Sequence, residues 1–161
     1  MSKPLIISRQ YKHSPEKIYD AFASAEALGS WWGPAGMGLN VLAHDFTPGG
    51  KFHYTMEMGE QISYGIMEFI SIKRPTEIQW LNSFADDKGN KIKPPFAAEF
   101  PLEIHNTVNL EANKDGTLLT IKGVPYNATE KEIAFFEGMF EGMNQGFSGT
   151  FDQLESYLSK L

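Results

Sequence analysis

Two tyrosines and a glutamate occupy positions where the sequence pattern predicts buried polar groups able to take part in chemistry. One stretch alternates with polar residues and contains Phe52, Tyr54, Met56 and Met58. A second stretch has the same period of two and contains Ile62, Tyr64, Ile66, Glu68, Ile70 and Ile72. Alternation of this kind is typical of antiparallel strands with one face on the core. We therefore expect Tyr54, Tyr64 and Glu68 to face the interior.

Glu68 is the most chemically informative of these positions. An unpaired carboxylate in an apolar interior costs free energy or takes up a proton. One hypothesis is a carboxyl with a raised pKa inside a cavity, acting as a general acid or orienting a polar ligand. The alternative is that a bulge or a strand end lets Glu68 reach water or a basic partner. Asn106, which is also predicted to point inward, could assist by hydrogen bonding.

The inward-facing residues together form the predicted ligand-binding set. Aromatic residues make up 13% of the chain, and seven methionines accompany them. Such side chains fill cores, and they also line apolar pockets that have a few convergent polar groups. The predicted set is Trp32, Phe52, Tyr54, Met56, Tyr64, Ile66, Glu68, Trp80, Phe84, Asn106, Met143 and Phe147.

Several other chemistries lack support in the sequence. The chain has no cysteine, which excludes disulfides, thiolate metal sites and cysteine nucleophiles. His13, His44, His53 and His105 show no metal-ligand spacing, and no serine lies in a nucleophile-elbow motif. Neither a metal nor a cofactor is expected. The pair Gly49–Gly50 is predicted to supply a positive φ in a turn rather than a phosphate cradle.

Length and charge favour one soluble domain over residues 1–161. The formal net charge is −6 and no run of Lys or Arg is present, which argues against nucleic acid. The chain has no signal-peptide pattern, and no window approaches the roughly 18 apolar residues of a membrane span. A cytoplasmic protein is the expectation.

The elements that must position these side chains follow from the order of the patterns. Residues 4–11 read as a strand, and Ser14 with Pro15 begins two short helices. Residues 39–123 carry about six antiparallel strands, with a polar loop at residues 85–101 that could cover a pocket. Residues 129–160 place apolar side chains every three or four positions, which predicts one long helix. This order predicts an α+β fold in which a curved antiparallel sheet of six or seven strands wraps around the C-terminal helix.

Two further patterns bear on the pocket and its surroundings. Of the pair Trp31 and Trp32, we expect one indole to plug the open end of the sheet and the other to guard the pocket mouth. A glycine stripe on the predicted long helix suggests either a bend or packed loop, or a homodimer contact made together with exposed Phe135 and Met139. The stripe consists of Gly138, Gly142, Gly146 and Gly149.

An ordered series of motifs resembles one known family over nearly the whole chain. The series comprises Trp31-Trp32-Gly33-Pro34, Asp45-Phe46-Thr47-Pro48-Gly49-Gly50-Lys51-Phe52, Gly65, Lys114-Asp115-Gly116-Thr117, Gly146-Phe147 and Gln153-Leu154-Glu155-Ser156-Tyr157-Leu158. It is similar to the family related to the activator of the heat-shock protein 90 ATPase, within the START-like helix-grip superfamily of pollen-allergen-like and polyketide-cyclase-like proteins. The chain departs from the family at Thr47, where an arginine is usual, and at Phe147, where a tryptophan is usual. The resemblance implies a helix-grip fold with a cavity between sheet and helix.

Three functions are compatible with these observations. The favoured one is binding of a small hydrophobic or amphipathic ligand, such as a lipid, an aromatic or a polyketide-like molecule. The second is a cyclase-like or hydratase-like enzyme that uses Glu68, Tyr54 or Tyr64 to move a proton. The third, regulation of a chaperone ATPase, rests on the resemblance alone.

Overall fold

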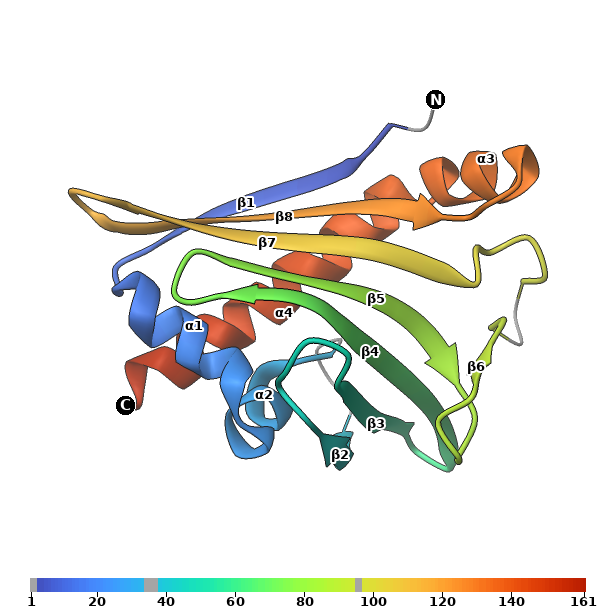
Figure 1. Cartoon of the computed structure of the whole chain (residues 1–161), viewed down its shortest axis with the longest axis horizontal. Coiled ribbons are helices and arrows are strands. Elements are labelled where there is room, and N and C mark those ends of the chain that lie inside the picture. Colours follow the sequence, from blue (N-terminus) through green and yellow to red (C-terminus); the bar gives the residue numbers. More distant parts are fainter. Residues whose placement is uncertain (1–2, 34–37, 95–96) are drawn as a thin grey trace.

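The computed structural model describes residues 3–33, 38–94 and 97–161, which form an α+β fold of one sheet and four helices (Figure 1). Pro34 and Gly36, which belong to the predicted turn after the tryptophan pair, lie outside the described residues. The strands are β1 (Leu5–Tyr11), β2 (Gly38–His44), β3 (Lys51–Met58), β4 (Gln61–Lys73), β5 (Glu77–Ala85), β6 (Lys91–Ile92), β7 (Glu103–Asn113) and β8 (Gly116–Tyr126). The helices are α1 (Pro15–Ala23), α2 (Ala25–Trp31), α3 (Glu130–Gly138) and α4 (Phe140–Ser159).

The sheet is antiparallel and open, and the C-terminal helix crosses one of its faces. Seven strands follow the order β1-β8-β7-β5-β4-β3-β2, and the short β6 pairs with β5. Figure 1 shows α4 running behind the bent sheet, with α1 and α2 at one end. The predicted helix-grip architecture, including the two short helices after the first strand, is confirmed.

The two short helices begin where the sequence signals placed them. The Ser14 side chain accepts a hydrogen bond from the backbone N–H of Lys17, and Pro15 occupies the first turn of α1. Ser24 caps α2 in the same way, because its hydroxyl accepts from the N–H of Ala27. Trp31 ends α2 fully buried, and its indole N–H donates to the carbonyl of Ala21 at 2.9 Å. Trp31 is therefore the indole that closes this end of the core.

The predicted continuous C-terminal helix is wrong at one point, since the chain turns between α3 and α4. Met139 has φ −98° and ψ 2°, and its N–H bonds to the carbonyl of Phe136, three residues back, rather than four. Gly138 and Gly142 flank the turn, and glycine costs an α-helix roughly 1 kcal/mol relative to alanine. The glycines therefore weaken the helix where it bends along the curved sheet, which agrees with the bend hypothesis.

The predicted inward face of β4 is also wrong. In an antiparallel pair, directly opposite residues share a face, and β3 presents Phe52 and Tyr54 to the core. Phe52 lies opposite Met67 and Tyr54 lies opposite Gly65, so the inward face of β4 carries the odd-numbered residues. An irregular register between Phe69 and Ser71 then changes the parity, so that Ile72 packs against the core instead.

The core lies between the concave face of the sheet and the helices α1, α2 and α4. Its largest fully buried side chains include Trp31, Trp80, Phe22, Phe52, Phe69 and Phe151. Among the described residues, no helix is long and apolar enough to cross a membrane.

Candidate functional site

A cavity of about 310 Å³ opens between the first half of α4 and the concave face of the sheet. Strands β3 and β5 supply one wall, the turn at Met139 and α4 supply the opposite wall, and the loop before β7 contributes Phe100. The lining is mostly aromatic and thioether, with polar groups from a few side chains. It consists of Trp32, Gly33, Tyr54, Met56, Asn82, Phe84, Phe100, Met139, Met143, Gly146, Phe147 and Thr150.

A short network of polar groups fixes the sheet side of this cavity. The indole N–H of Trp32 donates to the Tyr54 hydroxyl at 3.3 Å, and the indole N–H of Trp80 donates to Asn82 Oδ1 at 3.2 Å. Burial raises the pKa of the Tyr54 phenol, while hydrogen bonds from Trp32 and Asn82 act in the opposite direction. Tyr54 is therefore a neutral phenol at physiological pH, suited to hydrogen bonding. Gly65 leaves room for its ring, since an added Cβ would lie 2.5 Å from Tyr54.

Helix α4 holds the tryptophan segment in place from the other side. The Thr150 hydroxyl donates to the carbonyl of Gly33 at 2.9 Å. The Gln153 side-chain amide donates to the same carbonyl at 2.8 Å and to that of Trp31 at 3.1 Å. These bonds satisfy backbone carbonyls at the end of α2, which have no partner within the helix. They also set the position of Trp32 at the cavity.

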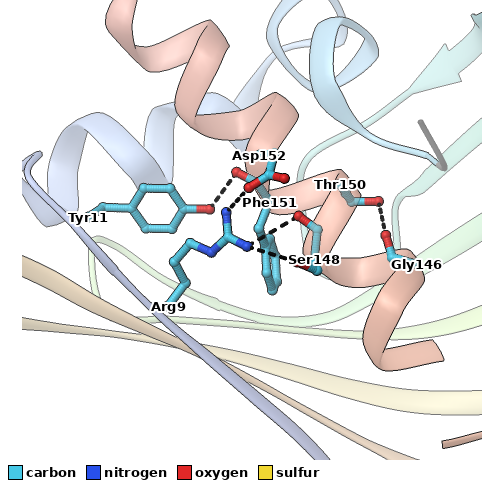
Figure 2. A network of polar contacts seen from close by, with 7 residues as sticks. All are labelled: Arg9, Tyr11, Gly146, Ser148, Thr150, Phe151 and Asp152. Carbon is cyan, nitrogen blue, oxygen red and sulfur yellow. Dashed lines mark hydrogen bonds and ion pairs between the residues drawn. The ribbon is translucent and has the colours of Figure 1, made fainter. Parts of the chain in front are cut away.

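Strand β1 anchors the same part of α4 (Figure 2). The buried Tyr11 hydroxyl donates to the carbonyl of Phe151 at 2.9 Å, and Arg9 pairs with Asp152 at 2.5 Å. Arg9 also donates to the carbonyl and the hydroxyl of Ser148, each at 3.2 Å. Burial raises the pKa of Tyr11 far above its usual range, so the phenol stays a hydrogen-bond donor. The middle of α4 is thus fixed to both β1 and the end of α2.

A smaller chamber of about 170 Å³ adjoins the first cavity. The two share Trp32, Asn82, Phe100, Met143 and Phe147 as lining residues. The smaller chamber adds Leu5, Ile104, Asn106 and Phe136. Asn106 is only 6% exposed. It is a polar residue that lines the smaller chamber and does not line the larger cavity.

The family model described as Activator of Hsp90 ATPase homolog 1-like protein matches residues 12–159. The chain belongs to this family. The match spans nearly the whole chain and confirms the resemblance drawn from the tryptophan pair and the Pro-Gly-Gly motif. Comparison with curated proteins gives no match.

Solved structures of other bacterial proteins share this fold. A protein from Arthrobacter aurescens is 25% identical with a TM-score of 0.80, covering 98% of this chain and 87% of its own. A protein from Staphylococcus epidermidis is 27% identical with a TM-score of 0.76, covering 99% of this chain and 92% of its own. An AHSA1 protein from Silicibacter pomeroyi is 19% identical with a TM-score of 0.73 over 98% of both chains, and shares the fold.

In this member of the Hsp90-ATPase-activator-like family, the structure brings together most of the residues predicted to face a ligand. The larger cavity is lined by Trp32, Tyr54, Met56, Phe84, Met143 and Phe147, and the smaller chamber by Asn106. Phe52 and Trp80 are fully buried in the core beside the cavity, and neither lines it. Trp32 thus occupies the position predicted for the indole at the pocket, while Trp31 closes the core.

Three predicted site residues lie on the opposite face of the sheet. Tyr64, Ile66 and Glu68 have the outward parity of β4, because its inward residues are set by the pairing with β3. Ile66 is nonetheless buried, since the loop between β5 and β6 covers it, and a Cβ at Gly89 would lie 3.8 Å from it. Because both faces of β4 carry buried apolar residues, the alternation does not show which face points inward. The sequence pattern therefore assigned the wrong face of this strand to the core.

Glu68 has a basic partner and no place in the cavity. Its carboxylate accepts a hydrogen bond from Lys91 at 2.5 Å, and Lys91 also bonds to Glu103 at 2.6 Å. The hydrogen bond from Lys91 lowers the pKa of Glu68, outweighing the opposite effect of burial. The hypothesis that Glu68 is an acid with a raised pKa is wrong. The alternative, that Glu68 reaches a basic partner, is confirmed. Glu68 reaches that partner because it lies on the outward face of the sheet, not because of a bulge.

Sequence reasoning missed five residues that line the larger cavity, and for one of them a signal was present. Asn82 has the same parity as Trp80 and Phe84, so alternation along β5 could have included it. Phe100 comes from a loop, and Met139 from the turn between α3 and α4, so neither has a periodic signal. Gly33 and Thr150 complete the set.

The glycine stripe borders open space along this part of the helix. A Cβ added at Gly138, Gly142 or Gly146 would meet no atom within 4 Å. Phe135, predicted to be exposed, is partly buried and packs edge-on against Phe100, while Met139 lines the cavity. Phe135 and Met139 are therefore not the exposed residues that the homodimer hypothesis used, and the homodimer contact stays a prediction.

The histidines lie apart from the cavity lining. His53 and His105 face outward as predicted, and their rings bond to the carbonyl of Asp86 and the side chain of Gln79. His44 points into the core, where burial lowers its pKa. Among the described residues, no cluster of three or more histidines and carboxylates could hold a metal ion.

The Pro-Gly-Gly motif forms a turn, as expected. Gly49 has φ 87°, a backbone conformation that favours glycine, and its N–H bonds to the carbonyl of Phe69 at 2.7 Å. Gly50 is needed for a different reason, because an added Cβ would lie 2.1 Å from the carbonyl oxygen of Asp45.

Proposed function

We propose that this protein binds a small apolar or amphipathic molecule in the cavity between the sheet and α4. The observation that carries the proposal is the lining of the larger cavity. Its described residues are aromatic rings, methionines and glycines, with the neutral polar side chains of Tyr54, Asn82 and Thr150. An apolar concave site with a few fixed polar groups is the usual form of a small-molecule site.

The construction of the cavity walls supports binding rather than mere imperfect packing. Trp32 and Tyr54 bond to one another, and Thr150 and Gln153 hold the carbonyl of Gly33. These bonds keep one wall fixed. The opposite wall carries Met139 and Met143, and methionine has three rotatable bonds that adapt to different ligand shapes.

Matched glycine variants provide the test. Gly146 lines the cavity, whereas Gly142 lies one turn away on the same helix and does not, and neither would place a Cβ near another atom. Gly146→Leu should place a side chain at the cavity lining and obstruct binding. Gly142→Leu should make the same change in helix propensity at a position that does not line the cavity. Thermal unfolding of wild type with a panel of lipids and aromatic compounds identifies a binder, because a ligand that binds the native state raises the melting temperature.

With that binder, calorimetric titration should show binding by Gly146→Leu weakened about tenfold or more, equivalent to about 1.4 kcal/mol. Gly142→Leu should bind as wild type does. Melting curves that stay flat across the whole panel, or equal affinity in both variants, would contradict the proposal.

No structural observation favours the other two functions. The enzyme hypothesis used Glu68, Tyr54 and Tyr64, and only Tyr54 faces the cavity. Chaperone regulation has the family description behind it and no described surface that supports it. Ligand binding is the function that the geometry supports best.

A further inference from the structure

Asn106 of β7 is a buried residue whose side chain lines the smaller chamber and has no hydrogen-bond partner among the described residues. It is 6% exposed, and in residues 3–33, 38–94 and 97–161 no hydrogen bond joins its side-chain amide to another group. A carboxamide offers two N–H donors and an acceptor oxygen. The buried polar atoms without a partner in the described residues are His44 Nδ1 and Thr55 Oγ1, and the Asn106 amide is not among them, so its polar atoms are open to the chamber. An amide that is open to a chamber and has no protein partner is available to a molecule bound there.

The local structure keeps space free around this amide. Gly123 lies opposite Asn106 on the neighbouring strand β8, and a Cβ added there would lie 2.9 Å from Asn106 Oδ1. The glycine therefore provides the room that the amide occupies. Leu5, Ile104 and Phe136 surround the chamber with apolar groups that offer no hydrogen bond in return.

Asn82 makes an instructive contrast, since it is an asparagine on the same face of the adjacent strand. Trp80 lies opposite Asn106 and Asn82 lies opposite Ile104, so the two asparagines are diagonal neighbours. Asn82 accepts a hydrogen bond from Trp80 and bonds to the Tyr54 hydroxyl. Asn82 is thus engaged by the protein, whereas Asn106 is available to a ligand.

The charge of the lining restricts what that ligand is. None of the described residues that line either chamber is Asp, Glu, Lys, Arg or His. Transfer of an ionised group from water to such an environment, without a counter-charge, costs much more free energy than transfer of a neutral polar group. A carboxylate or ammonium is disfavoured here, and a hydroxyl, ketone or carboxamide is suited to the site.

The two chambers are close enough for one molecule to use both. Five side chains line both of them, and one of these is the flexible Met143. A molecule whose apolar body occupies the larger chamber can therefore extend a polar end past Met143 toward Asn106.

We infer that the ligand is an uncharged, mainly apolar molecule whose hydrogen-bonding end lies in the smaller chamber and is recognised by the Asn106 amide. This inference rests on the proposed function and names its ligand class. It assigns Asn106 as the specificity-determining residue and the larger chamber as the site of the apolar body.

Two series of probes test the assignment by calorimetric titration. One series is naphthalene bearing a methyl, hydroxyl, carboxamide or carboxylate group at the same carbon, and the other is an octyl chain with the same end groups. In wild type, the hydroxyl and carboxamide probes should bind about five- to tenfold tighter than the methyl probe, the usual effect of one buried hydrogen bond. The carboxylate should bind about tenfold more weakly than the hydroxyl or worse.

Asn106→Leu should abolish this preference and leave the affinity of the methyl probe within about twofold. Leucine replaces an unpaired amide, so the variant should melt at or above the wild-type temperature, which separates loss of recognition from loss of folding. Asn109→Leu makes the same change at an exposed position on the same strand, and should keep the wild-type preference.

The outcomes separate this inference from the proposed function. If methyl and hydroxyl probes bind equally well in wild type and in Asn106→Leu, the cavity binds ligands but Asn106 does not select them, and the inference is overturned. A carboxylate that binds best also overturns it. If neither series nor the wider lipid and aromatic panel binds wild type, the proposed function fails and the inference fails with it.

Discussion

The two halves of α4 face the same sheet and differ in how they are held. Residues 150–159 include the four buried side chains of the helix, Thr150, Phe151, Leu154 and Leu158. Residues 140–149 include none that is fully buried, and at Gly142 and Gly146 an added Cβ would find open space. The hydrogen bonds that join α4 to β1 and to the end of α2 fall between Ser148 and Gln153.

This difference separates scaffold from binding wall within one helix. Segments with few buried apolar contacts open at lower free energy than the packed core. The second half of α4 fixes the position of Trp32 and the sheet, and the first half forms the adaptable wall of the cavity with Met143 and Phe147. Substitutions in the two halves should therefore have opposite signatures, one on stability and the other on binding.

Replacement of a phenylalanine in each half should give the largest contrast. Phe151 is 1% exposed, so Phe151→Ala should destabilise by about 3–5 kcal/mol. Phe147 is partly buried and already borders a cavity, so Phe147→Ala should cost less than about 2 kcal/mol while changing ligand affinity. Urea unfolding measures the first effect and calorimetric titration the second. Equal loss of stability in both variants would remove the distinction between the halves.

Loss of the Tyr11 hydroxyl should give the next largest effect. Tyr11→Phe removes the buried bond to the Phe151 carbonyl and should destabilise by about 1 kcal/mol. Tyr157→Phe is the matched control, because no hydrogen bond to the Tyr157 hydroxyl occurs among the described residues. Urea unfolding should show a shift for the first variant alone; a similar shift for both would mean that the bond adds nothing to stability.

Replacement of Gly142 or Gly146 by alanine should raise the free energy of unfolding by about 0.5–1 kcal/mol at each site. Neither Cβ meets a neighbour, so only helix propensity changes. Thermal unfolding checks the gain. Gly146→Ala should also reduce the affinity of a cavity ligand slightly, whereas Gly142→Ala should leave it unchanged. A loss of stability at either position would contradict the finding that an added methyl group has open space there.

The Arg9–Asp152 ion pair should give the smallest effect. The Asp152 side chain is 71% exposed, and surface ion pairs contribute up to about 1 kcal/mol, with most near half of that. Asp152→Asn should therefore destabilise by about 0.5 kcal/mol or less, and the difference should shrink at high salt. Urea unfolding at low and high salt measures both. A larger loss of stability that does not change with salt concentration would contradict this expectation and would show that Asp152 stabilises the second half of α4 as a structural contact.

The sequence predicted most of the fold because local signals were consistent with one another. Ser14 and Pro15 marked a helix start, Gly49 marked a turn with positive φ, and the spacing of Phe151 and Leu154 marked a buried helix face. It also placed Tyr54 and Asn106 on the inward face of the sheet and Trp32 at the pocket. Each of these signals depends on a few neighbouring residues, which is the information that a sequence pattern carries.

The errors arose where long-range pairing decides the outcome. Tyr64, Ile66 and Glu68 alternate correctly, but only the register with Phe52 and Tyr54 fixes which face they take. A shift of the strand register by one residue moves every side chain to the other face. Because a loop covers part of the outer face of β4, that face also carries a buried apolar residue, and the pattern does not distinguish the two faces. The turn at Met139 likewise interrupts a helical pattern that continues on both sides of it.

The sequence by itself determined most of the elements, their order, the lack of cysteine, and an apolar lining between sheet and helix. Only the tertiary structure decided that Glu68 pairs with Lys91 on the outer face, that Phe100 and Met139 line the cavity, and that Asn106 faces a chamber with no side-chain partner in the described part of the chain. The physical reason is that helix and strand periodicity is local, whereas strand register, loop placement and hydrogen-bond partners depend on residues far apart in the chain.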